Sequence, residues 1–118
     1  MPLNIASEME AVCEGIRAQG VPAVIDERDA NPPCVLVQPP ELSFRFGQGR
    51  FDATWTALVM VPNAGKNVAL GQLGELIELA AKGIRAAVLA GQPADVQLPD
   101  NAAPVPGYSI NWSSKIIV

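Results

Sequence analysis

The sequence predicts an α+β domain in which two helices lie on one face of a mostly antiparallel sheet of about four strands. Two segments carry apolar residues at helical spacing, one beginning near residue 5 and one near residue 68. Short segments between and after them alternate apolar and polar residues, as half-buried strands do. The expected order is α-β-β-β-α-β, with a long projecting hairpin, in a single domain of 118 residues.

The first helix is predicted from an apolar stripe with spacings of four, three and four. The stripe consists of Ile5, Met9, Val12 and Ile16. Asn4 and Ser7 are alternative N-caps, Ser7 because Glu10 follows it at the spacing of a capping box. Gly20 suits the left-handed residue that ends a helix, and Pro22 prevents the helix from resuming.

Two short strands are expected next, at 23–26 and 34–37. The second is an apolar run with a pair of prolines on each side, in the segment "NPPCVLVQPP". Proline lacks the N–H that a sheet ladder needs, so it is tolerated at the ends of a strand and damages its middle. The prolines therefore indicate a strand that does not extend in either direction.

Residues 41–61 predict the hairpin, with glycine in the loop at 47–49 where a positive φ is needed. Its first strand alternates Leu42, Phe44 and Phe46 with Ser43 and Arg45. One face of the return strand carries Phe51, Ala53, Trp55, Ala57, Val59 and Val61. The other face begins polar and turns apolar at Leu58 and Met60, which predicts burial on both faces only in the inner half.

The second helix is expected over residues 68–90, ended by Gly91 and Pro93. Its apolar stripe consists of Leu73, Leu76, Ile77, Ala80, Ile84, Ala87 and Val88. A proline-rich surface loop follows, and then a half-buried strand in which Tyr108, Ile110 and Trp112 alternate with serine and asparagine. Trp55 and Trp112 are expected to pack near the helices.

Composition narrows the class of protein. Hydrophobic residues make up 49% of the chain, which excludes disorder, and charged residues make up only 17%, which suggests a surface covered by oligomerisation. The net charge of −4 and the scattered basic residues argue against binding of nucleic acid by charge attraction. The start has no basic region and the apolar runs are short, so a soluble protein made in a cytoplasm is expected, with no membrane contact.

No enzyme, cofactor or metal site is predicted. The chain has no histidine and only two cysteines, expected to be buried, reduced thiols, so a zinc site made by the protein alone is excluded. The three carboxylates of "DERD" at 26–29 lie in one turn rather than facing each other across a cleft. Cys13 lacks a base to activate it, and Ser113 and Lys115 lack the spacing of Ser–Lys hydrolases.

The chain resembles the tail terminator, or minor tail protein U, family of bacteriophages with long non-contractile tails. The resemblance covers nearly the whole chain. It rests on "AQGVPAV" after the first helix, the proline-bounded "PPCVLVQPPEL", the strand "WTALVMVP", the helix "LGQLGELIELAAKGIRAAV" and the terminal "PGYSINWSSKIIV".

This resemblance implies a virion protein at the top of the tail that assembles as a ring, usually a hexamer. The ring would cap the tail tube, end its polymerisation and present the surface that a head–tail connector or stopper protein meets. Double-stranded DNA would pass through the lumen without specific binding, and an acidic balance suits such a passage. The implied partners are thus other copies of the chain, the tail tube protein and the connector.

The predicted contact site for a neighbouring subunit or the tube is the hairpin tip, consisting of Phe44, Arg45, Phe46, Arg50 and Phe51. An apolar face for one neighbour and a cation for an acidic partner would both be present there. The alternative is that these aromatic side chains fold back onto their own sheet. Two other functions stay open: another head–tail connector or head-closure protein of the neck, and a small α+β domain with a ligand pocket between helices and sheet.

Overall fold

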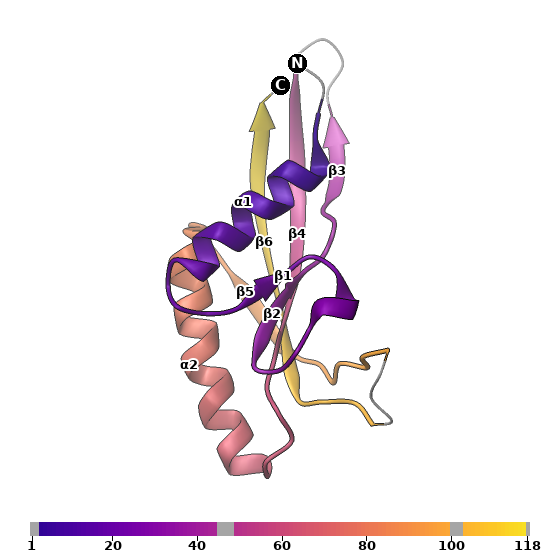
Figure 1. Ribbon diagram of the computed structural model, residues 1–118. Helices are drawn as coiled ribbons and strands as arrows, with labels where there is room; N and C mark the ends of the chain where they lie inside the picture. The colour runs from indigo at the N-terminus through magenta and orange to yellow at the C-terminus, as the bar shows by residue number, and fades with distance from the viewer. Residues whose placement is uncertain (1–2, 45–48, 100–102, 118) are drawn as a thin grey trace.

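Two strands of eleven residues each form the long axis of the molecule, β4 (Arg50–Met60) and β6 (Gly107–Ile117). They pair antiparallel along their whole length, from Arg50↔Ile117 to Met60↔Gly107. The computed structural model describes residues 3–44, 49–99 and 103–117 and is elongated, with extents of 51 × 28 × 23 Å. Figure 1 shows both strands running from the wide end of the molecule to its narrow end.

The sheet has six strands in the order β1-β2-β4-β6-β5, and β3 also pairs with β4. β1 (Ala23–Val24) pairs parallel to β2 (Cys34–Val37), which pairs antiparallel to β4. On the other side, β5 (Ala90–Pro93) pairs antiparallel to β6. The sheet is therefore mixed, although its pairs are mostly antiparallel, as predicted. The prediction of about four strands in the order α-β-β-β-α-β is wrong in strand number and in order, because four strands precede α2 and two follow it in the described residues.

β2 and β3 (Glu41–Phe44) lie one after the other along the same edge of β4. Three residues, 38–40, separate them, whereas only two residues of β4 separate their partners Ala57 and Thr54. This one-residue excess is a bulge, and it shifts the alternation so that Val37 and Leu42 face the same side. Pro39 and Pro40 therefore interrupt a strand that continues, rather than ending it.

α1 (Ile5–Arg17) is capped by Asn4, whose Oδ1 accepts a hydrogen bond of 3.0 Å from the Ser7 N–H. Of the two predicted caps, Asn4 is thus the one used. The helix buries Met9, Cys13 and Ile16 against the sheet. Of the predicted stripe, Val12 is half-buried and Ile5 at the start of the helix is exposed. Gly20 takes a φ of +84° just after the helix, as predicted.

α2 (Lys66–Ile84) lies on the same face of the sheet as α1 and contacts it (Figure 1). The two helices meet at Gly15 and Gly83. A Cβ on Gly83 would lie 2.5 Å from the Gly15 carbonyl oxygen, and one on Gly15 would lie 2.6 Å from that of Gly83. Only hydrogen atoms fit at this crossing, so both positions require glycine.

α2 ends six residues earlier than predicted. Arg85 adopts a left-handed conformation with φ of +60°, and its N–H donates to the Ala81 carbonyl at 3.0 Å. The apolar spacing that extended the prediction to residue 90 includes Val88, whose side chain is 79% exposed. The residues beyond leave the helix and form β5, a strand that the prediction lacked.

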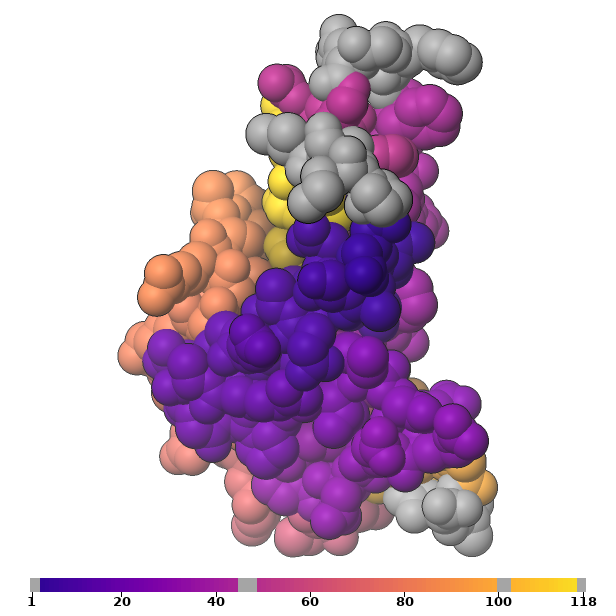
Figure 2. All heavy atoms as spheres, turned by 45° about the horizontal axis from the view of Figure 1, so that its top comes forward, coloured from indigo at the N-terminus to yellow at the C-terminus, as the bar shows by residue number. Residues whose placement is uncertain are grey.

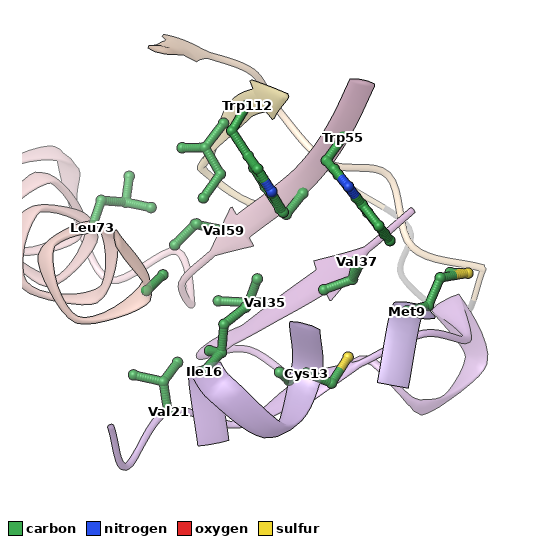
Figure 3. Packing of buried hydrophobic residues seen from close by; sticks show 14 of the residues in the cluster. Met9, Cys13, Ile16, Val21, Val35, Val37, Trp55, Val59, Leu73 and Trp112 are labelled. Atoms are coloured by element: carbon green, nitrogen blue, oxygen red, sulfur yellow. The ribbon is translucent and has the colours of Figure 1, made fainter. Parts of the chain in front are cut away.

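The main core lies between the helices and the sheet. It contains the predicted face of β4, together with Val35 and Val37 of β2 and Ile110 and Trp112 of β6. Trp55 and Trp112 are cross-strand partners whose rings stack with centroids 5.9 Å apart and 5° between planes (Figure 3). The expectation that both tryptophans pack near the helices is confirmed.

The other face of the sheet is covered only at the wide end. Residues 94–99 and 103–106, within the region predicted as a surface loop, lie across this face and form the bridge Val96↔Val105. A second cluster results, consisting of Cys34, Leu36, Met60, Val96, Leu98 and Val105. Burial of the inner half of β4 on both faces is thus as predicted, because Met60 is fully buried whereas Thr54 is exposed.

Candidate interaction surface

The narrow end of the molecule is a three-stranded arm. We call it the distal arm and define it as β3, residues 50–54 of β4 and residues 113–117 of β6. The prediction placed a two-stranded hairpin there, but β6 accompanies β4 to Arg50 and supplies the third strand. Figure 2 shows the described end of β3 and β4, in magenta, protruding beyond α1, in indigo.

An aromatic pair lies near the end of the distal arm. Phe44 of β3 and Phe51 of β4 are cross-strand partners, with ring centroids 5.5 Å apart and 46° between the ring planes. Phe51 is half-buried and packs against the main core, whereas Phe44 is 61% exposed. The arm thus presents an aromatic ring to solvent on the face that carries the helices elsewhere.

Three of the five predicted site residues come together in this region. Phe44 and Phe51 share one face, and the adjacent Arg50 is exposed. Arg45 and Phe46 lie outside the residues that the structure describes. Both rings contact each other within their own sheet, Phe51 half-buried against the main core and Phe44 61% exposed, so the contact site and the alternative of aromatics folded back onto the sheet both stay predictions.

The opposite face of the sheet is polar along the arm and the adjoining strands. Asp52 of β4 pairs across the strands with Lys115 of β6, and Thr54 pairs with Ser113. Further along, the Thr56 hydroxyl donates to Asn111 Oδ1 at 2.8 Å. Hydroxyl and amide side chains outnumber charges here, so this face interacts with water without a concentrated charge of either sign.

The distal arm also has two open edges. Within residues 3–44, 49–99 and 103–117, no strand pairs with the outer side of β3, and none pairs with the outer side of β6 beyond Asn111, the residue opposite the start of β5. A hollow of about 400 Å³ borders the edge of β6 at this point and is lined by Thr54, Ala87, Val88, Ala90, Asn111, Trp112 and Ser113. Unpaired strand edges are templates for pairing with another chain.

Sequence reasoning missed the open edge of β6. A signal was present, since alternation runs from Tyr108 to Ser113 and Ile116 again stands on the face of Tyr108, Ile110 and Trp112, which would make this strand as long as the return strand of the hairpin. This signal was not sufficient, because the alternation of apolar and polar residues in a strand does not reveal which strands it pairs with.

The carboxylates of "DERD" form a solvated turn, as the sequence indicated. Asp26 caps a short 3₁₀ helix (Glu27–Asp29) and accepts hydrogen bonds from the backbone and the guanidinium of Arg28, the latter at 2.9 Å. The hydrogen bond from the Arg28 side chain lowers the pKa of Asp26. The other carboxylates of the turn are exposed, so the turn has no buried acid.

The two cysteines are buried and free, as expected. Burial is the main cause that raises the pKa of Cys13 from 9.0 to about 11, and it also raises the pKa of Cys34. Both thiols are therefore protonated at neutral pH, which makes them poor nucleophiles and poor metal ligands. In the described part of the chain, acidic and cysteine side chains form no group of three that would suit a metal ion.

A hollow with a mixed lining lies at the wide end, between the start of α2 and the residues after β5. Its volume is about 500 Å³, and Asn63, Lys66, Asp95 and Tyr108 contribute the polar groups of its wall. Prolines and leucines, among them Pro93, Pro104, Pro106, Leu70 and Leu73, provide most of the remainder. This is the pocket that a small-molecule ligand would need.

Comparison with models of known protein families finds no match to this chain, and comparison with curated protein sequences finds none either. No helix among the described residues combines the length and the apolar run that crossing a bilayer requires.

Proposed function

We propose that the protein is a non-catalytic subunit of a bacteriophage tail, a tail terminator that assembles into a ring on the last ring of the tail tube. The ring ends tube polymerisation and provides the surface to which the filled head attaches through its connector. Its six or so copies are the same chain, and DNA passes through the lumen.

The observation that carries this proposal is the distal arm. A narrow extension with an exposed phenylalanine and two open strand edges is unfavourable for an isolated monomer in water. Burial of the arm between neighbouring subunits would cover the exposed phenylalanine and pair the open strand edges. The low share of charged residues, 17%, fits the same explanation, because much of the surface is then covered.

Charge supports the role in DNA passage. The chain carries a net charge of −4, and the polar face of the sheet is rich in hydroxyl and amide groups such as Thr54, Thr56 and Asn111. A lumen lined by this face would neither grip phosphates through cations nor repel them strongly. Double-stranded DNA would then slide through the lumen.

The decisive experiment adds the purified protein to tail tube protein from the same phage genome during tube assembly. Wild-type protein is expected to shorten the tubes, and negative-stain images to show a ring with a central hole at one tube end. The double variant Phe44→Asp with Phe46→Asp is expected to stay folded, by circular dichroism, and to leave tubes long. Tubes of equal length with and without the wild-type protein would contradict termination, and intact rings from the double variant would refute the aromatic contact.

A second function, a ligand-binding domain, is favoured by the hollow of about 500 Å³ beside Lys66 and Tyr108. It predicts a compact monomer at every concentration and saturable binding of a small molecule that Tyr108→Ala abolishes. Screening a metabolite library by thermal shift, with light scattering on the same samples, separates this function from the ring. Cryo-EM of intact particles separates a terminator from a head-closure or connector protein of the neck.

A further inference from the structure

We infer that the open edge of β6 in one copy pairs, in parallel, with the open edge of β3 in a second copy, so that the distal arms join into one continuous sheet. This inference rests on the proposed ring, which brings copies side by side, and it names the contact that holds them. The contact is heterologous, using a different edge on each side, and such contacts generate rings when they close.

The direction of backbone groups follows from two hydrogen bonds at the wide end. The Gln38 N–H donates to the Thr56 carbonyl at 3.0 Å, so even-numbered residues of β4 direct their backbone groups toward β2 and β3. Ala94 N–H donates to the Gly107 carbonyl at 3.0 Å, so odd-numbered residues of β6 direct theirs away from β4. The open edge of β6 therefore presents the N–H and C=O of Ser113 and Lys115.

The same alternation fixes the edge of β3. Glu41 and Ser43 are opposite Thr54 and Asp52, which are even-numbered, so their backbone groups point to β4. Leu42, between them, directs its N–H and C=O outward. Leu42 thus offers a donor and an acceptor to the outside of β3, and Ser113 and Lys115 of β6 offer the complementary groups.

The register matches the requirement for parallel pairing. Through β4, Leu42 lies level with Ala53 and with Ser114. If a neighbouring arm stands at the same height, Leu42 N–H points at the Ser113 carbonyl and the Lys115 N–H points at the Leu42 carbonyl. These two bonds, to the residues on either side of the level position, are those that a parallel ladder forms.

Side chains continue across the junction in the same way. β3 carries Leu42 and Phe44 on the apolar face and Glu41 on the polar face, while β6 carries Ser114 and Ile116 on the apolar face and Lys115 on the polar face. Joining the edges places Phe44 beside Ile116 and Leu42 beside Ser114, and it places polar side chains beside polar ones on the opposite face. Glu41 and Lys115 become diagonal neighbours two positions apart, within reach of an ion pair.

This complementarity favours a second copy over an unrelated strand. β3 has four residues, and the open part of β6 begins just after Asn111, so the two edges are of similar length. Pro40 of the neighbour comes level with Trp112, beside the hollow of about 400 Å³. Proline has no N–H and needs no acceptor there, which suits the point where the edge of β6 closes because β5 begins.

The test compares Lys115→Pro with Lys115→Ala. Proline removes an N–H that points to the open edge, so the fold is expected to survive, whereas alanine keeps this N–H and removes only the charge. Light scattering coupled to size exclusion, from about 10 μM to about 1 mM, measures association. We expect association of Lys115→Pro to be weaker by about tenfold or more than that of Lys115→Ala, with unchanged circular dichroism in both.

A charge exchange identifies the partner edge. Lys115→Glu alone is expected to weaken association, and Glu41→Lys in the same chain is expected to restore it. This rescue distinguishes β6–β3 pairing from a symmetric β6–β6 contact, in which Glu41 has no part. Failure of the rescue would overturn the inference, as would equal association of the proline and alanine variants.

The inference and the proposed function fail in different ways. Rings that persist in Lys115→Pro would overturn the edge contact and leave the terminator function intact. Wild-type protein that stays monomeric to about 1 mM, with no slowing of Lys115 amide exchange when tube-bound, would also overturn it. The function itself fails only if wild-type protein does not limit tube length.

Discussion

The two halves of the same strand pair have different surroundings. At the wide end, Val59 and Met60 of β4 are fully buried, Val59 under the helices and Met60 under Val96, Leu98 and Val105. In the distal arm, Asp52 and Thr54 of the same strand remain on an uncovered polar face. One half of the sheet therefore supplies the free energy of folding, and the other half is available for contacts with other molecules.

The crossing of the two helices is where a substitution should cost the most stability. Gly83→Ala would put a Cβ 2.5 Å from the Gly15 oxygen and 2.8 Å from the Ile16 Cα, and backbone atoms cannot move aside easily. We expect a loss of about 3 kcal/mol, the upper end of the usual cost of overpacking. Urea unfolding measures this loss in the free energy of unfolding.

The matched control for the helix crossing is Gly74→Ala. It lies in the same helix, where a new Cβ meets nothing within 4 Å. Alanine is expected to raise the free energy of unfolding by about 0.5–1 kcal/mol, because it favours the helix. Equal effects at both positions would show that the helices do not cross at these glycines.

Alkaline pH should lower the free energy of unfolding through Cys13. The unfolded thiol of Cys13 ionises near its ordinary pKa of 9.0, whereas the folded thiol keeps its proton up to about pH 11. Between these values the unfolded chain releases a proton that the folded chain retains, so stability falls as pH rises. The expected loss is on the order of 2 kcal/mol.

Urea midpoints at about pH 8 and about pH 10.5 measure this loss. The Cys13→Ala variant controls for the titration of lysine and tyrosine, which both chains share. Its midpoint is expected to change less over the same interval. An identical change in both proteins would rule out Cys13 as the source.

The smallest effect on stability is expected at the end of the distal arm. Phe44 is 61% exposed, so Phe44→Ala should change the free energy of unfolding by less than about 0.5 kcal/mol. Phe51→Ala, which removes a half-buried ring from the edge of the core, is expected to cost about 1–2 kcal/mol. If Phe44→Ala lowered the free energy of unfolding of a monomer more than Phe51→Ala does, the end of the distal arm would contribute to the stability of the fold, contrary to the division between the two halves of the sheet.

Much of the wide end could be predicted from the sequence because its signals are periodic. The stripe of Met9 and Ile16 located α1, and the alternation from Ala53 to Val61 located the buried face of β4. These patterns report burial, and burial is what hydrophobic spacing encodes. The α+β class with two helices followed directly.

The pairing between strands was harder to predict from the sequence. Nothing local in Ala90–Pro93 indicates a strand, since its four residues are exposed and owe their conformation to the edge of β6. The parallel contact of β1 with β2 and the bulge at Pro39 likewise depend on partners distant in the sequence. The candidate site was found in part for this reason: the aromatic residues of the arm are visible in the sequence, and its open edges are not.

The pairing of β4 with β6 over eleven consecutive residues also determines how the molecule responds to force. A pull on β6 at the narrow end, with β4 held at the wide end, acts in shear on every rung of this ladder at once, so the rungs share the load and do not open one at a time. The Trp55–Trp112 stack and the hydrogen bond of 2.9 Å from Trp55 Nε1 to the Ser114 hydroxyl lie midway along the ladder and resist sliding. Tension applied to β6 at the end of the arm is therefore transmitted along the ladder into the main core.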